Sequence, residues 1–544
     1  MIRRLLFAFL CVAFLHPQEA AAATCDSLTS LPLRNGQITS AQMVTAGAFA
    51  PPAAPGRGGA ARAGAPAEGE GRAGAAAGRA GRGAGRGNAP NVYAMLPAFC
   101  RVAATLTPTN DSEIKIEVWL PDSANWNGKF EAVGNGGLAG TIAYPAMAAA
   151  LASGYATTST DTGHSGNNGA FMLGHPEKVI DFGYRAVHEM TVQAKAVIGG
   201  YYSSAPKFSY FNGCSLGGRQ GITEAQRYPA DYDGIVAGAV AWGGMDRYVG
   251  VVMNNSSMQR TSGAYIPPEK YPAVHEAVLQ ACDGLDGVKD GILENPLACQ
   301  FDPKVLQCKA GEDSVSCLTA AQIQTVNMIY AGAKDPKTGK VLTGGLMRGT
   351  ELQWSTLYGP QPYGNAAEPL KYLVMKDANW DPNTFNPATD VERAQKADPD
   401  DVLKSDNANI KPFFDRGGKL LMYQGFADPQ VTSDNAIRYH QMVLDKVGKG
   451  VEGKSIELFM VPGMYHCQGG PGTDTFNKMA AIEQWVEKGK APDRIVASHM
   501  TDGKVDRTRP LCVFPKLAKW NGTGSTDDAA NFSCVADSAL RATK

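Results

Sequence analysis

The early part of the chain alternates apolar and polar positions in the way that β-strands do. Residues 114–120 alternate, and residues 129–133 repeat the pattern after a polar turn. The Met- and Ala-rich stretch 144–153 predicts a helix, and residues 154–160 predict another strand. Strands that alternate with helices are typical of a doubly wound, mainly parallel sheet of the α/β class.

The same rhythm continues beyond this region. Helices are predicted at 183–200, 221–228 and 479–488, and buried strands at 208–211, 234–239, 419–423 and 455–461. Between them, residues 243–409 are irregular and rich in Pro, Gly and Asp, with a hydrophobic content too patchy for an independent core. We therefore expect a lid domain at 243–409, inserted between the two parts of one α/β domain, 24–242 and 410–544.

Two further segments are expected to lie outside the fold. Residues 1–23 combine Arg3 and Arg4, an apolar run too short to span a bilayer and three alanines, which indicates a signal peptide. Residues 51–90 are almost wholly Ala, Gly, Pro and Arg and predict a disordered insertion. Its arginines can also contact an anionic polymer, although a solvated loop is the simpler interpretation. The mature protein is expected to be exported, either periplasmic or extracellular, with no membrane span.

Charge and cysteine content narrow the class of protein. A formal net charge of −1 provides no basic field for binding nucleic acid. Of the 11 cysteines, Cys11 lies in the signal peptide, and the even remainder predicts five disulfides in an oxidising compartment. Proximity in the sequence favours the pairs Cys282–Cys299, Cys308–Cys317 and Cys512–Cys534, and Cys25 can pair with Cys100 across the insertion.

A Gly-x-Ser-x-Gly motif at 213–217 carries the first sign of chemistry. Ser215 lies between a predicted buried strand and a predicted helix, which is the context of a nucleophile elbow. Glycines on both sides allow the sharp turn that exposes the serine hydroxyl. Taken by itself, the pentapeptide is equally compatible with a plain glycine-rich turn.

A serine nucleophile needs a base and an acid that orients the base. In α/β-hydrolases they follow in the order Ser, Asp or Glu, His, at the ends of later strands. Asp428 follows the strand at 419–423, and His466 follows the strand at 455–461. The competing residues are Asp434 and Asp401 for the acid, and His440 and His499 for the base.

Oxyanion stabilisation requires backbone N–H groups beside the nucleophile. The first expected donor is Leu216, and the second is Gly136 or Gly137 in the glycine-rich loop after the strand at 129–133. Cys214 precedes Ser215 and Cys467 follows His466. A disulfide between them would fix the separation of nucleophile and base; the alternative is two unrelated structural cysteines.

Several motifs together resemble one family. The Cys-Ser, Asp and His-Cys order, with a large insertion between serine and acid, is similar to the tannase/feruloyl esterase family. The similarity covers most of the mature chain and includes the segments 126–130, 133–137, 159–164, 174–178 and 181–186. It implies an α/β-hydrolase fold with an inserted lid, the triad Ser215, Asp428 and His466, and a Cys214–Cys467 disulfide. The insertion at 51–90 departs from the family pattern but lies far from these motifs.

The predicted lid contains a second group of chemistry-bearing residues. Three carboxylates within residues 283–292, separated by glycines, can converge on a hard cation, or can form a solvated loop. The spacing is not that of an EF-hand. The family resemblance implies a structural calcium ion that stabilises the lid and takes no part in catalysis, held by Asp283, Asp286, Asp290 and the carbonyls of Val288 and Ile292.

The sequence thus predicts an exported serine esterase that acts on small esters of aromatic carboxylic acids, such as feruloyl, galloyl or terephthalate monoesters. The alternatives are a non-catalytic binding protein on a hydrolase scaffold, and a peptidase or lipase of the same fold. Candidates for contacting substrate are lid residues that either bind it or serve packing and solvation: the aromatics Trp354, Tyr358, Tyr363 and Trp380, and the cations Arg348 and Lys371.

Overall fold

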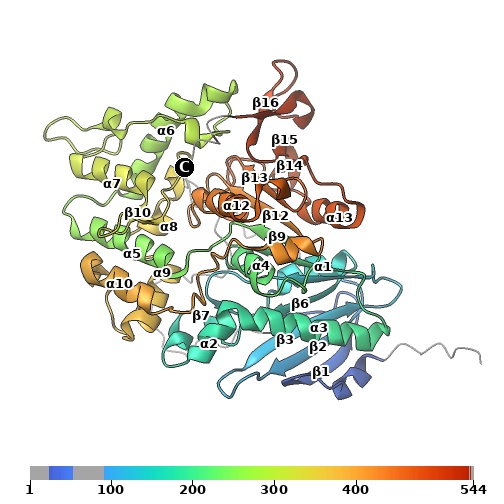
Figure 1. Ribbon diagram of the computed structural model, residues 1–544. Coiled ribbons are helices and arrows are strands. Elements are labelled where there is room, and N and C mark those ends of the chain that lie inside the picture. Colours follow the sequence, from blue (N-terminus) through green and yellow to red (C-terminus); the bar gives the residue numbers. More distant parts are fainter. Residues whose placement is uncertain (1–23, 53–90, 538–539, 541–544) are drawn as a thin grey trace, which may run out of the picture.

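A nine-stranded mixed sheet forms the centre of the computed structural model, which describes residues 24–52, 91–537 and 540 (Figure 1). Strands β1 to β3 and β6 pair antiparallel, and from β6 onward all neighbours are parallel. In spatial order the strands are β1 (Gly36–Val44), β2 (Phe99–Leu106), β3 (Ile114–Pro121), β6 (Ala156–Thr160), β4 (Lys129–Val133), β8 (Phe208–Cys214), β9 (Gly234–Gly238), β12 (Lys419–Gly425) and β13 (Ile456–Val461).

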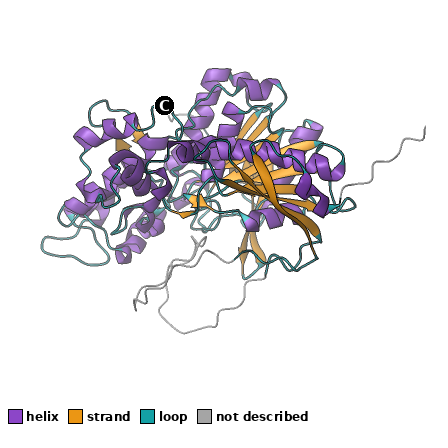
Figure 2. Cartoon of the chain, turned by 90° about the horizontal axis from the view of Figure 1, so that it is seen from below, coloured by secondary structure: helices purple, strands orange, loops and turns teal. Residues whose placement is uncertain are grey.

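Helices cover both faces of this sheet (Figure 2). The buried residues of β12 alternate between two hydrophobic clusters, with Leu420 and Met422 in one and Leu421 and Tyr423 in the other. The first cluster includes α3 (Ala186–Tyr202), α4 (Leu216–Arg227) and α12 (Ser433–Val447), and the second includes α1 (Tyr144–Ala152) and α13 (Lys478–Lys488). Two further short helices, α2 (Pro176–Ile180) and α11 (Lys411–Asp415), come before α3 and β12 in the chain. This is the α/β architecture that the alternation predicted.

The edge strand β1 is an element that the pattern did not predict. Its residues are mostly half-exposed or exposed, with Ala41 as the buried exception. A strand of this kind gains its order from pairing with β2, so its sequence shows little alternation. The expected signal peptide at 1–23, and nearly all of the expected insertion at 51–90, lie outside the described residues.

Residues 244–403 contradict the expectation of a segment without its own core. A large hydrophobic cluster is built mainly from this segment and includes fully buried Trp354, Leu370 and Val326. Helices separated by irregular stretches with Pro and Gly produce it, so the apolar period is interrupted along the sequence. The elements are α5 (Gly244–Arg260), α6 (Tyr271–Cys282), α7 (Ala320–Ala331), β10 (Ala333–Lys334), β11 (Val341–Thr343), α8 (Ser355–Tyr358), α9 (Gly364–Pro369) and α10 (Pro387–Lys396).

This segment lies to one side of the sheet, in green to orange in Figure 1. It connects β9 to β12, which are hydrogen-bonded neighbours in the sheet. The chain ends in two antiparallel hairpins, and a further pair of two-residue strands lies near the start of the sheet. These are β14 (Arg494–Thr501) with β15 (Lys504–Cys512), β16 (Lys516–Trp520) with β17 (Phe532–Ala536), and β5 (Ala139–Gly140) with β7 (Gly166–Asn167).

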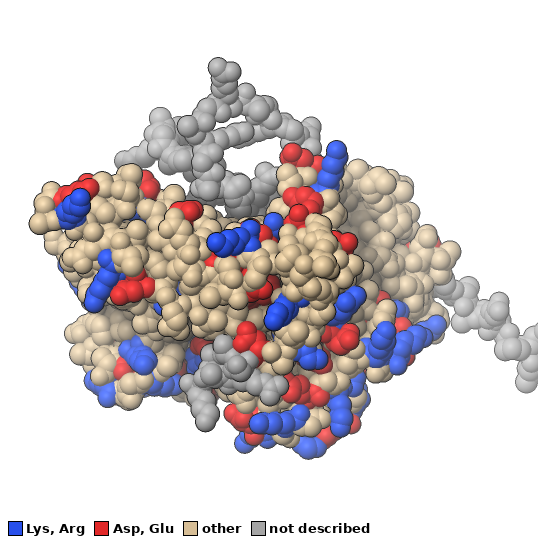
Figure 3. Space-filling view, turned by 90° about the horizontal axis from the view of Figure 1, so that it is seen from above, with Lys and Arg blue, Asp and Glu red and all other residues tan. Residues whose placement is uncertain are grey.

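The described residues form five disulfides, which include the three pairs favoured by proximity, the possible Cys25–Cys100 pair and the Cys214–Cys467 pair that the family resemblance implied. Cys25–Cys100, Cys282–Cys299, Cys308–Cys317 and Cys512–Cys534 join neighbouring segments, and Cys214–Cys467 joins residues 253 positions apart. Among the described residues, none of the helices has the length and apolar character needed to cross a bilayer. On the face shown in Figure 3, basic and acidic side chains are interspersed over the described residues.

Candidate active site

The turn between β8 and α4 has the geometry of a nucleophile elbow. Ser215 adopts φ 64° and ψ −119°, a conformation that side chains rarely take, and its N–H donates to the Gly238 carbonyl at 3.0 Å. A Cβ added to Gly213 would lie 2.5 Å from the backbone of Gly217, and one added to Gly218 would lie 2.0 Å from the Gly238 oxygen. The glycines are therefore required by close backbone packing around the serine.

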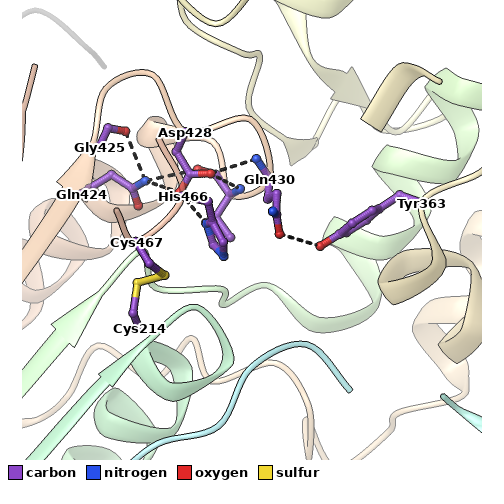
Figure 4. Close-up of a disulfide and its surroundings, with 9 residues drawn as sticks. Cys214, Tyr363, Gln424, Gly425, Asp428, Gln430, His466 and Cys467 are labelled. Carbon is purple, nitrogen blue, oxygen red and sulfur yellow. Dashed lines mark hydrogen bonds and ion pairs between the residues drawn. A yellow bond between two sulfur atoms is a disulfide. The ribbon is translucent and has the colours of Figure 1, made fainter. Parts of the chain in front are cut away.

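Asp428 and His466 form a bonded pair on the loops that follow β12 and β13 (Figure 4). The imidazole Nδ1–H donates to Asp428 Oδ2 at 2.8 Å. Oδ1 accepts the N–H groups of Gln430 and Val431 at 2.8 and 3.0 Å, and Oδ2 also accepts Gln424 Nε2 at 2.9 Å. The carboxylate is fully buried, while the imidazole is 11% exposed. Four hydrogen bonds fix the direction of the carboxylate.

A disulfide joins this pair to the elbow. Cys214 and Cys467 are bonded with their Cα atoms 6.0 Å apart, and they are the immediate neighbours of Ser215 and His466. Figure 4 shows the bridge below the His466 ring. The nucleophile candidate and the base candidate are thus held close together although they lie far apart in the sequence.

The glycine-rich loop after β4 is fastened against the elbow. Asn135 accepts the Gly217 N–H at 2.8 Å through its carbonyl, and its own N–H donates to Gln220 Oε1 at 3.0 Å. A Cβ added to Gly134 would lie 2.6 Å from the Gly217 Cα. Among the described residues, no acceptor is bonded to the N–H of Leu216, Gly136 or Gly137. These three groups remain available to a negatively charged oxygen beside Ser215.

The competing acids and histidines lie elsewhere. Asp434 pairs with Arg438 within α12, and Asp401 pairs with Lys404. His440 is buried in α12, where its Nε2 is without a partner among the described atoms. His499 bonds to Asp506 on the β14–β15 hairpin. None of them bonds to the His466–Asp428 pair.

The lid candidates for contacting substrate have different environments. Trp354 is 0% exposed, and Tyr358 is also buried, so both belong to the core of the lid segment. Arg348 stacks on Tyr330, 4.3 Å from the ring centroid. Trp380 and Lys371 are half-buried. Substrate stacking by Trp354 and Tyr358 is therefore ruled out by burial.

Tyr363 is the lid candidate that bonds to the loop of Asp428. Its hydroxyl donates to Gln430 Oε1 at 3.0 Å, two residues beyond Asp428 (Figure 4). Sequence reasoning named Tyr363 only as a stacking candidate, and it missed Gln424 and Gln430 entirely. The Tyr363–Gln430 contact joins residues 67 positions apart, so no local sequence pattern predicts it. Gln424 lies near the end of β12, and this position could have been recognised from the sequence.

The acidic loop after α6 contains the predicted cation ligands. Asp286, Val288, Asp290 and Ile292 line a small cavity, together with Pro462 and residues of the C-terminal hairpins. Burial, and then the neighbouring Asp290 and Asp283, raise the pKa of Asp286 to about 6. Carboxylates that repel each other beside a cavity are what a bound divalent cation neutralises. Asp290 Oδ2 is also held by Arg509 at 2.6 Å.

Residues 100–535 match the family model described as tannase and feruloyl esterase. An uncharacterized esterase of Xanthomonas campestris is 34% identical, with 98% of this chain and 95% of the relative covered. A probable feruloyl esterase B-1 of Aspergillus oryzae is 35% identical, with 80% and 84% covered.

Two solved structures agree with these relatives. Feruloyl esterase B from Aspergillus oryzae superimposes with a TM-score of 0.81 at 31% identity, covering 94% of this chain and 99% of that one. Tannin acyl hydrolase from Aspergillus niger has a TM-score of 0.74 at 21% identity, with 95% of each chain covered, and is alike in fold.

Proposed function

Because this chain belongs to the tannase and feruloyl esterase family and is a carboxylic-ester hydrolase, we propose that Ser215, His466 and Asp428 are its catalytic triad. The observation that carries the proposal is the Cys214–Cys467 bridge, which keeps the elbow beside the bonded His466–Asp428 pair. The family and the α/β-hydrolase fold expected from the motifs are confirmed.

The geometry supports acyl transfer through serine. His466 Nε2 takes the proton of Ser215 Oγ as the oxygen attacks the ester carbonyl carbon. The resulting oxyanion accepts hydrogen bonds from the Leu216 N–H and from Gly136 or Gly137. The ester C–O bond then breaks, the alcohol leaves with the proton from His466, and an acyl-enzyme remains. Water, deprotonated by His466, attacks the acyl carbon and releases the acid and free Ser215.

The proposed substrates are esters of aromatic carboxylic acids, including feruloyl, galloyl and terephthalate monoesters. Support comes from relatives named feruloyl esterases that cover most of the chain. Binding without catalysis, the alternative raised by the sequence, does not agree with a carboxylic-ester hydrolase, and a fluorophosphonate should label Ser215.

Replacing the nucleophile tests the triad. Ser215→Ala should abolish turnover of every ester in a panel of feruloyl, galloyl, chlorogenic and terephthalate monoesters, with a loss of about 10⁴-fold or more. Thermal unfolding should be unchanged, and exposed Ser204→Ala is the matched control. Retained turnover in Ser215→Ala would refute the triad, and ranking the panel by kcat/KM identifies the preferred acyl group.

Two further properties belong to the proposal. Calcium would be held by Asp283, Asp286 and Asp290 with the carbonyls of Val288 and Ile292, and would supply structural charge neutralisation. Five disulfides support export to an oxidising compartment, either the periplasm or the medium.

A further inference from the structure

Helix α9 of the lid segment contacts both loops of the proposed catalytic site. Asn365 lies against the glycine-rich loop after β4, where a Cβ added to Gly137 would be 3.1 Å from Asn365 Nδ2. Glu368 Oε2 accepts the N–H of Gly169 at 3.0 Å. Tyr363, the N-cap residue of α9, reaches Gln430 in the loop of the catalytic acid. Helix α9 and its N-cap residue thus contact both the glycine-rich loop after β4 and the loop of Asp428.

The hydroxyl of Tyr363 is held in a fixed direction. Asn365 Nδ2 donates to the Tyr363 oxygen at 3.0 Å, so the hydroxyl proton is directed to Gln430 Oε1. The backbone carbonyl of Tyr363 is also constrained, because it accepts the N–H groups of Ala366 and Ala367 in the first turn of α9. The tyrosine therefore presents a rigid donor.

Gln430 transmits this contact to the acid. Its backbone N–H donates to Asp428 Oδ1 at 2.8 Å, and its carbonyl accepts Arg247 Nη2 of α5 at 3.2 Å. With Oδ1 occupied in this way, Oδ2 is directed at His466. Both α5 and α9 belong to the lid segment, so the position of Gln430 depends on that segment being docked.

We propose that Tyr363 is a positioning residue, which aligns Asp428 for catalysis through Gln430 and makes the docked lid a condition for full activity. The proposal rests on the triad assigned above. The hydroxyl of Tyr363 carries the effect, whereas a side chain that only filled space would act through its ring.

Tyr363→Phe tests this role, since it keeps the ring and removes the hydroxyl. One lost hydrogen bond predicts a fall in kcat of about threefold to tenfold with KM within about twofold. Tyr372→Phe is the matched control, because Tyr372 is half-buried in the same segment and its hydroxyl forms no hydrogen bond to a described residue. Its kcat should equal that of the wild type.

A double-mutant cycle shows whether the effect passes through Gln430. The Tyr363→Phe/Gln430→Ala enzyme should lose no more kcat than Gln430→Ala alone. Unchanged kcat in Tyr363→Phe, equal losses in Tyr363→Phe and Tyr372→Phe, or additive losses in the cycle would each overturn the proposal. Those results leave the triad standing if Ser215→Ala is inactive, whereas an active Ser215→Ala enzyme would refute the triad as well.

Discussion

Glu131, a buried residue of β4, makes the stability of the folded protein depend on pH. Glu131 precedes the glycine-rich loop after β4, and its carboxyl group accepts a hydrogen bond from Asn212 Nδ2 of β8 at 3.0 Å. Burial raises the pKa of Glu131 to about 7, against opposing effects of the Asn212 bond and Lys478. The unfolded chain releases this proton near the ordinary value of 4.5, so ionisation favours the unfolded state as pH rises from about 4.5 to 7.

We predict that Glu131→Gln removes this pH dependence. The raised pKa costs the wild type roughly 3 kcal/mol between pH 5 and 8, and a glutamine oxygen can still accept the Asn212 bond. The variant should therefore gain unfolding temperature relative to the wild type at pH 8 and little at pH 5. Exposed Glu113→Gln is the control. Parallel melting curves at both pH values would count against a buried, protonated Glu131.

At the scale of elements, the strands that lead to Asp428 and His466 were predictable because all their residues except Lys419 are buried. β12 and β13 read as apolar runs, and the residues that follow them are Asp428 and His466. β1 could not be found in the same way, because its half-exposed residues depend on β2 for order. The Tyr363–Gln430 contact is set by how α9 docks, which no local pattern encodes.

The bridge between elbow and histidine loop gives the prediction at this scale. Cys214→Ser/Cys467→Ser should lower stability by roughly 5 kcal/mol on the chain-entropy estimate for a long loop, and should also lower kcat because Ser215 and His466 are less firmly held. Cys308→Ser/Cys317→Ser, which opens a loop of 9 residues in the lid, is the control and should keep its turnover. Equal kcat in both double variants would show that the bridge serves stability alone.

Across the whole molecule, the acidic loop lies where three parts of the chain meet. Its cavity is lined by lid residues, by Pro462 of the segment between β13 and His466, and by Arg509 and Phe532 of the C-terminal hairpins. Ala518 N–H donates to Glu294 Oε1 at 2.9 Å across the same junction. A cation here would hold the lid to the rest of the protein at a site distinct from the triad.

Removal of calcium should therefore lower the melting temperature of the purified protein, and added Ca²⁺ should restore it. Asp286→Asn should melt at the lower temperature with or without calcium, while exposed Asp527→Asn should behave as the wild type. Metal analysis that finds no calcium, together with melting that ignores chelator and Ca²⁺, would exclude the site. Turnover of the protein that remains folded should change little, since the ion contacts no reacting atom.

The lid segment connects β9 to β12, which are adjacent parallel strands of the sheet. Because parallel strands point the same way, their connection must return along the full length of the strands, which takes about a dozen residues or more. Above that minimum, the sheet places no upper limit on the length of the lid segment. The lid segment can therefore change in length or sequence while the strands that lead to Ser215, Asp428 and His466 keep their positions.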